Sequence, residues 1–224
     1  MNWINKSIKD AKELNNHMKL NSVDIFIKDK ISNGIKVDFV FEYIAKFIPS
    51  HLLTGVDIIY VGHFDVFDEK EVNAIYQDGA IYITNQQTSD KDMIDDIIHE
   101  ISHSVEEVQK ENIYGDGRLM KEFMGKRKKL FSLLKQMNLS PDISLTTNPS
   151  YDDKIDNYFY KEVGYPQMWN IINGLFPSPY SCTCLREYFA IGFEKYFLGE
   201  RRLIKSVCPV LFNKLEHLES LGER

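Results

Sequence analysis

The sequence is poor in cysteine, which excludes a disulfide-stapled fold. Its 224 residues contain three cysteines, Cys182, Cys184 and Cys208. Three thiols cannot form a disulfide framework, so they indicate a reducing compartment. Cys182 and Cys184 are separated by one residue, whereas the usual zinc-binding pair is CxxC and comes with a second pair. We therefore interpret Cys182 and Cys184 as chemically inert.

Long apolar runs and an excess of positive charge are missing as well. No apolar run approaches the roughly 18 residues of a membrane span, and no apolar signal segment follows Met1. We therefore expect a cytoplasmic protein without a membrane partner, which leaves delivery by a non-classical route or in a virion open. Lys and Arg number 27 against 33 Asp and Glu, a net charge of −6, which argues against nucleic acid as the main partner. We interpret the one basic run, Lys126–Lys129, as a solvated helix face.

The residues that are present predict an α+β fold with a small mixed sheet and a mostly helical C-terminal half. Hydrophobic residues make up 43% of the chain, which is enough for a core. Alternating or β-rich segments predict strands at 23–27, 56–61, 72–76 and 80–84. Helical periodicity predicts helices at 3–20, 37–47, 89–109, 118–137, 158–176 (interrupted near Gly164), 183–198 and 203–221. We expect one domain, with the sheet and the first long helix in 1–109 and helices in 110–224.

The most informative stretch is His99-Glu100-Ile101-Ser102-His103, an HExxH motif within the predicted helix 89–109. On a helix, histidines four residues apart lie one turn apart on the same face and can bind one zinc ion. The glutamate between them can then act as general base on a water molecule. The helix has an apolar stripe on the side opposite the histidines: Ile94, Ile97, Ile98, Ile101, Val105 and Val108. Ser89 is a plausible N-cap for it.

A catalytic zinc needs a third protein ligand, and helix 183–198 offers a carboxylate for that position. Glu187 and Glu194 both lie opposite the aromatic stripe of this helix, seven residues apart. Its small residues, Ala190 and Gly192, predict a close approach to the motif helix. The remaining candidates are weaker, since three consecutive turns of one helix diverge from a single ion and isolated histidines are usually structural. These candidates are Glu106, Glu107, His17, His51, His63 and His217.

At this point the sequence resembles a known family. HExxH, followed downstream by Glu187-Tyr-Phe-Ala-x-x-Phe with Tyr180 seven residues ahead of the glutamate, resembles the zincin metallopeptidases that include the anthrax lethal factor catalytic domain and the Pro-Pro endopeptidases. Cys208-Pro209-Val-Leu-Phe212 is similar to their C-terminal helix. The resemblance runs from about Gly79 to the C-terminus.

The resemblance implies a zincin-like fold of the type with HExxH and a downstream glutamate. It implies one zinc ion bound by His99, His103 and Glu187, with Glu100 as the base and Tyr180 as hydrogen-bond donor to the oxyanion. The chain departs from the family in a longer insertion at 114–176 and in having no signal peptide. Preference for proline at the cleavage site therefore does not carry over.

These observations predict a zinc-dependent metalloendopeptidase acting on a protein or peptide substrate. If strand 80–84 were a sheet edge, it could also pair with an extended substrate. The alternative is a zincin-fold binding or structural component of a larger assembly with little or no proteolytic activity. A host-directed toxin domain would share the chemistry but differ in its role.

Overall fold

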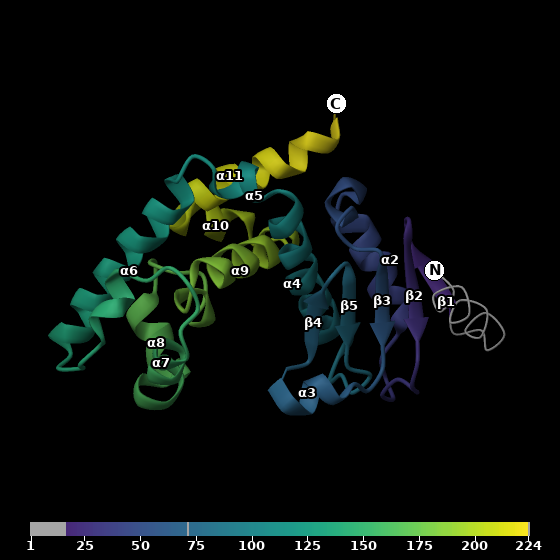
Figure 1. The fold of residues 1–224 in the computed structure, drawn as a ribbon, viewed down its shortest axis with the longest axis horizontal. Helices are drawn as coiled ribbons and strands as arrows, with labels where there is room; N and C mark the ends of the chain where they lie inside the picture. The colour runs from purple at the N-terminus through teal and green to yellow at the C-terminus, as the bar shows by residue number, and fades with distance from the viewer. Residues whose placement is uncertain (1–16, 71, 224) are drawn as a thin grey trace. The chain divides into compact units, whose positions relative to one another are not determined.

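The structure, a computed structural model, describes residues 17–70 and 72–223. These residues form a mixed α+β fold in two compact units, which confirms the α+β class, while the zincin-like fold stays a prediction. The described residues up to Val108, with Gly222 and Glu223, make up the sheet-containing unit, and Gln109–Leu221 makes up the helical unit (Figure 1). The single catalytic domain expected from the sequence stays a prediction.

The first unit is built on a five-stranded mixed sheet of order β1-β2-β3-β5-β4 (Figure 1). The strands are β1 (His17–Leu20), β2 (Val23–Ile27), β3 (Ile58–Val61), β4 (Ala74–Gln77) and β5 (Ala80–Ile83). Strands β2, β3 and β5 run parallel, while β1 and β4 are antiparallel to their neighbours. The strand predicted at 80–84 is therefore an inner strand, and the edge beside it is β4, which the Asp78-Gly79 turn joins to β5.

The core of this unit lies on one face of the sheet. Ile25, Ile59 and Ile81 stand in register on three neighbouring strands and are fully buried. Helices α2 (Val37–Phe47) and α4 (Asp90–Val108) contact the sheet and each other. Because side chains alternate along a strand, the opposite face carries the next residues. It holds a stacked aromatic row in the same register: Phe26, Tyr60 and Tyr82. The unit also contains η1 (Ser50–Leu53) and α3 (Asp65–Lys70).

The second unit consists of helices joined by loops, with no strand among its described residues. Its α-helices are α5 (Lys110–Tyr114), α6 (Arg118–Gln136), α7 (Asp153–Asn157), α8 (Tyr165–Ile172), α9 (Leu185–Phe197), α10 (Arg201–Val207) and α11 (Pro209–Ser220). Short 3-10 turns form η2 (Ile143–Thr146) and η4 (Tyr180–Cys182), a π turn forms η3 (Tyr158–Val163), and η5 (Leu221–Glu223) ends the described chain. The predicted break near Gly164 is confirmed, with the glycine at φ +82°.

Three predictions about elements need correction. The helix expected at 203–221 is two helices, because Pro209 cannot donate the backbone hydrogen bond that would continue α10 and instead begins α11. The helix expected at 3–20 is strand β1 in residues 17–20, and its remaining part lies outside the described residues. Gly192 makes its close approach to α11, where an added Cβ would stand 2.2 Å from Leu211. Within the described chain, no helix is long and apolar enough to cross a membrane.

Candidate metal centre

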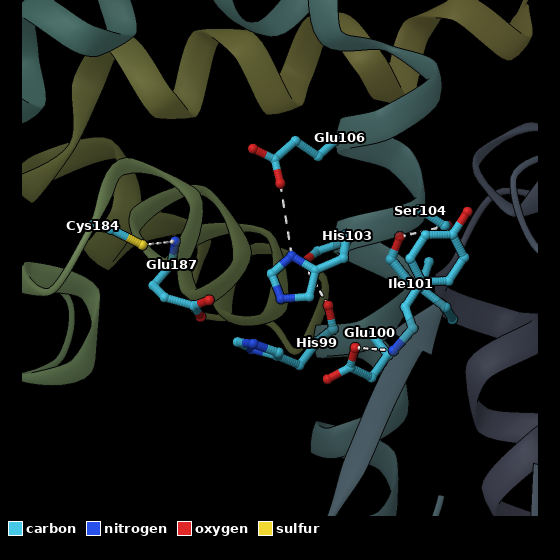
Figure 2. A network of polar contacts seen from close by, with 10 residues as sticks. His99, Glu100, Ile101, His103, Ser104, Glu106, Cys184 and Glu187 are labelled. Atoms are coloured by element: carbon cyan, nitrogen blue, oxygen red, sulfur yellow. Dashed lines mark hydrogen bonds and ion pairs between the residues drawn. The ribbon is translucent and has the colours of Figure 1, made fainter. Parts of the chain in front are cut away.

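Helix α4 presents the two histidines of the HExxH motif side by side (Figure 2). The helix starts where it was predicted to start, since the Ser89 hydroxyl accepts a hydrogen bond from the Asp92 N–H at 3.1 Å. One turn apart on one face, the His99 and His103 rings lie 4.9 Å apart, centroid to centroid, and nearly perpendicular. Their ring nitrogens can therefore face a common point.

Glu100 is fixed by the edge strand of the sheet. Its side chain is 9% exposed, and Oε2 accepts a hydrogen bond of 2.6 Å from the Tyr76 N–H on β4 (Figure 2). Only every second residue along β4 forms backbone hydrogen bonds with β5. The bond from the Thr84 N–H to the Asn73 carbonyl shows that Asn73 is one of these residues, so Tyr76, three positions later, is not. Tyr76 therefore points its N–H away from β5, and this outward donor reaches the carboxylate. A hydrogen bond to a charged acceptor is among the stronger ones, so this contact holds the carboxylate in place.

His103 has a carboxylate partner within its own helix. Its Nδ1 lies 3.7 Å from Oε2 of Glu106, one turn further on (Figure 2). This separation is beyond an ordinary hydrogen bond, so the contact is electrostatic. A proton on Nδ1 is favoured by the nearby negative charge, which leaves Nε2 as the nitrogen that can bind a metal. Glu106 is thus placed where it can orient the His103 ring.

In the helical unit, Glu187 lies in the first turn of α9. Its backbone N–H donates to Sγ of Cys184, the N-cap residue (Figure 2), at a distance of 3.5 Å. Glu187 is 8% exposed. Tyr180 lies on η4, just before this helix. Burial raises the pKa of Tyr180, and the nearby Glu187 carboxylate raises it further. The Tyr180 phenol therefore keeps its proton and can act as a hydrogen-bond donor.

His99, His103 and Glu187 form a group whose ligand atoms all lie within 4.8 Å of one another, so this group could hold a metal ion. Among the described residues, no other group of three such side chains lies this close together. The group contains Glu187 and not Glu194, and it does not include the other histidines. Two of these have carboxylate partners of their own, His17 with Asp24 and His63 with Asp68. The three cysteines are buried free thiols, as predicted.

Two features near these residues were not predicted from the sequence. One is the Tyr76 N–H on Glu100, which a backbone group provides and no residue type signals. The other is Arg127, which was interpreted as part of a solvated basic face and is in fact 0% exposed. The spacing on α6 did contain the signal, because Arg127 follows Phe123 by four residues and precedes Leu130 by three, within the buried stripe.

Comparisons of the chain with protein-family models, with curated proteins and with solved structures found no match. The assignment of this centre therefore rests on its own geometry and chemistry.

Proposed function

We propose that this protein is a zinc-dependent metalloendopeptidase with a zincin-like fold, similar in plan to the lethal factor and Pro-Pro endopeptidase family. The observation that carries the proposal is the His99, His103 and Glu187 group, with Glu100 next to one of its ligands in sequence. Its substrate is a protein or peptide.

The donor set fits zinc. Two imidazole nitrogens and one carboxylate oxygen are a set that hydrolytic zinc sites use, with the fourth position left for water. Glu187 and His103 are both buried, so their lone pairs face little competing solvent. Calcium and magnesium prefer sets made of oxygen atoms, so two imidazoles disfavour them. Zinc bound here would polarise the scissile carbonyl and lower the pKa of a water molecule.

The side chains of the site transfer the proton and stabilise the oxyanion. Glu100 accepts the proton of the attacking water and then donates it to the leaving amine. The Tyr76 N–H holds one oxygen of this carboxylate, which leaves the other oxygen for the proton. Tyr180, a protonated phenol, donates a hydrogen bond to the oxyanion that develops on the substrate carbonyl.

Replacing Glu100 by glutamine tests the proposal directly. The variant should bind zinc with wild-type stoichiometry and lose peptide cleavage by a factor on the order of 100 or more, because it keeps the shape of the base without its basicity. Zinc content and cleavage of a peptide library are the two measurements. Glu107→Gln, at an exposed position on the same helix, is the matched control and should cleave normally.

Three outcomes would contradict the proposal in different ways. Undiminished cleavage by Glu100→Gln would remove Glu100 as the base. Wild-type protein that binds zinc yet cleaves nothing in the library would favour a structural or binding component. Wild-type protein that binds no zinc would end the metallopeptidase assignment.

A further inference from the structure

Arg127 stands out in the helical unit as a fully buried cation. It lies in the middle of α6, within the insertion at 114–176, and is among the largest side chains that are fully buried. The Phe123 ring, one turn earlier, covers one side of it, with the ring centroid 5.1 Å from Cζ. Burial lowers the pKa of Arg127 to about 10, so the guanidinium is still charged at neutral pH.

The guanidinium binds two backbone carbonyls that are far apart in sequence. Nη1 donates to the carbonyl of Asn148, and Nη2 donates to the carbonyl of Thr183 at 3.0 Å. The two carbonyls lie on the loop after α6 and on the turn between η4 and α9. The planar guanidinium holds its donors at a fixed angle, so these bonds fix the two carbonyls relative to each other.

The Thr183 carbonyl lies in the segment that carries two proposed functional residues. It lies between Tyr180, the proposed oxyanion donor, and Glu187, the proposed ligand. Thr183 is itself bonded back to Tyr180, because its N–H and its hydroxyl both donate to the Tyr180 carbonyl, at 3.0 and 2.8 Å. A shift of Thr183 would therefore move the start of α9 and the η4 turn together.

A second contact joins the same two segments. The Leu185 N–H at the start of α9 donates to the Pro149 carbonyl at 2.8 Å. The loop at residues 148–149 thus pairs with residues 183–185 through both the guanidinium and a direct backbone bond. Residues of the insertion therefore hydrogen-bond to the start of α9 and help to hold it in place.

We propose that Arg127 is a positioning residue that holds Tyr180 and Glu187 in place through the Thr183 carbonyl. This inference rests on the proposed function. It extends that function by giving the insertion a role: the insertion sets the geometry of the third ligand and of the oxyanion donor. Supporting groups of this kind typically change metal affinity by about 10- to 100-fold when they are removed.

The neighbouring residue Lys126 provides a matched control. Its Nζ also donates to two backbone carbonyls, those of Leu175 and Val207, and it comes from the same helix. Those carbonyls lie outside the 180–187 segment. Lys126→Met therefore removes a comparable cation with a comparable pair of bonds and should lower the melting temperature without touching the proposed support.

The experiment compares Arg127→Met, Arg127→Lys and Lys126→Met with the wild type at a temperature where all are folded. Amide hydrogen exchange over residues 180–188 and Co²⁺ affinity, followed by the visible absorption of the bound ion, are measured. Arg127→Met should expose the 180–188 amides and lose about 10- to 100-fold in Co²⁺ affinity. Arg127→Lys keeps the charge but loses the planar arrangement of N–H donors, so its losses in amide protection and in Co²⁺ affinity should be intermediate. Lys126→Met should keep wild-type values in both measurements.

Unchanged exchange and affinity in Arg127→Met would overturn the proposal, and so would equal losses in Lys126→Met, which would indicate general loosening. If Arg127→Met fails to fold, the comparison of Arg127→Lys with Lys126→Met decides the question in the same way. Absence of Co²⁺ binding in the wild type would count against the metal centre alone. In that case hydrogen exchange over 180–188 still decides whether Arg127 holds the segment.

Discussion

Glu106 is a residue outside the HExxH motif whose charge acts on His103, one of the proposed metal ligands. Its carboxylate faces Nδ1 of His103 from 3.7 Å and favours the tautomer that leaves Nε2 for a metal. Loss of such an outer carboxylate lowers the basicity of the ligand and loosens its ring orientation. The side chain lies within the first turn after the histidine, so the effect is local to α4.

Replacing Glu106 by glutamine should therefore weaken zinc binding about tenfold and leave the fold intact. The measurement is a competition titration against a chelating dye, with circular dichroism to check the helix content. Glu107→Gln, one position further on and exposed, should bind zinc like the wild type. Equal losses in the two variants would mean that the net charge of the helix matters and that the contact to His103 does not.

A second prediction for a single residue concerns the Tyr180 side chain. Tyr180→Phe should keep its zinc and lose about 100-fold in kcat, since one oxyanion donor contributes about 3 kcal/mol. Because burial raises the pKa of Tyr180 in the wild type, its phenol stays protonated and the rate should show no loss from its ionisation up to pH 10. Both the loss in kcat of Tyr180→Phe and the pH dependence of the wild-type rate can be measured by steady-state kinetics. The measurements should run from about pH 6 to about pH 10, roughly the range in which general acid–base groups titrate. A wild-type rate in Tyr180→Phe would exclude the residue from the reaction.

Among the elements, α4 connects sequence and site most directly. Its periodicity and its N-cap could both be predicted from the sequence, and the helix forms at Asp90–Val108. The Ser89 hydroxyl satisfies the N–H of Asp92, one of the donors that the first turn leaves without a helical partner. The cap therefore fixes where the helix that carries both histidines begins.

Replacing Ser89 by alanine should lower the free energy of unfolding by about 1 kcal/mol, because the cap is lost and nothing replaces it. Ser132→Ala, at an exposed position near the C-terminal end of α6, is the control and should be neutral or slightly stabilising. Urea denaturation of both variants provides the comparison. A loss in Ser132→Ala as large as that in Ser89→Ala would show that the cap is not responsible.

Elements with a clear hydrophobic periodicity could be predicted from the sequence, whereas features that depend on tertiary contacts could not. Helix α2 spans the predicted 37–47. HExxH predicted two candidate metal ligands, because histidines four residues apart on a helix lie on the same face. The third ligand needed a family resemblance, since spacing alone could not separate Glu187 from Glu194. Helices α3 and α5 are too short to show a period. Arg127 was misread because a charge usually marks a solvated face, and only packing reveals the exception.

For the whole molecule, the buried thiols of the helical unit make stability depend on pH. Burial raises the pKa of Cys208 from its ordinary value near 9 to about 11, and the side chain is fully buried. In the unfolded chain the thiol ionises near pH 9, so between pH 9 and 11 the unfolded state binds fewer protons than the folded state. The stabilisation is therefore complete below pH 9 and is lost as the pH rises towards 11.

Cys208→Ala should reduce this pH dependence. Between pH 8 and about pH 10.5 the wild type should lose about 2 kcal/mol more in free energy of unfolding than the variant does. Denaturant unfolding at the two pH values, under reducing conditions, measures the difference. If both proteins lose equal stability, Cys208 does not remain a thiol in the folded protein through this range.

The Tyr76 amide, which donates to Glu100, has a further consequence for any ligand that extends β4. An edge strand offers outward N–H and C=O groups to an added strand, and here one N–H is already engaged by the proposed base. An added strand whose carbonyl accepted a hydrogen bond from this N–H would displace the Glu100 carboxylate from it. Binding along the edge and the position of the Glu100 carboxylate would then be linked through this single N–H group.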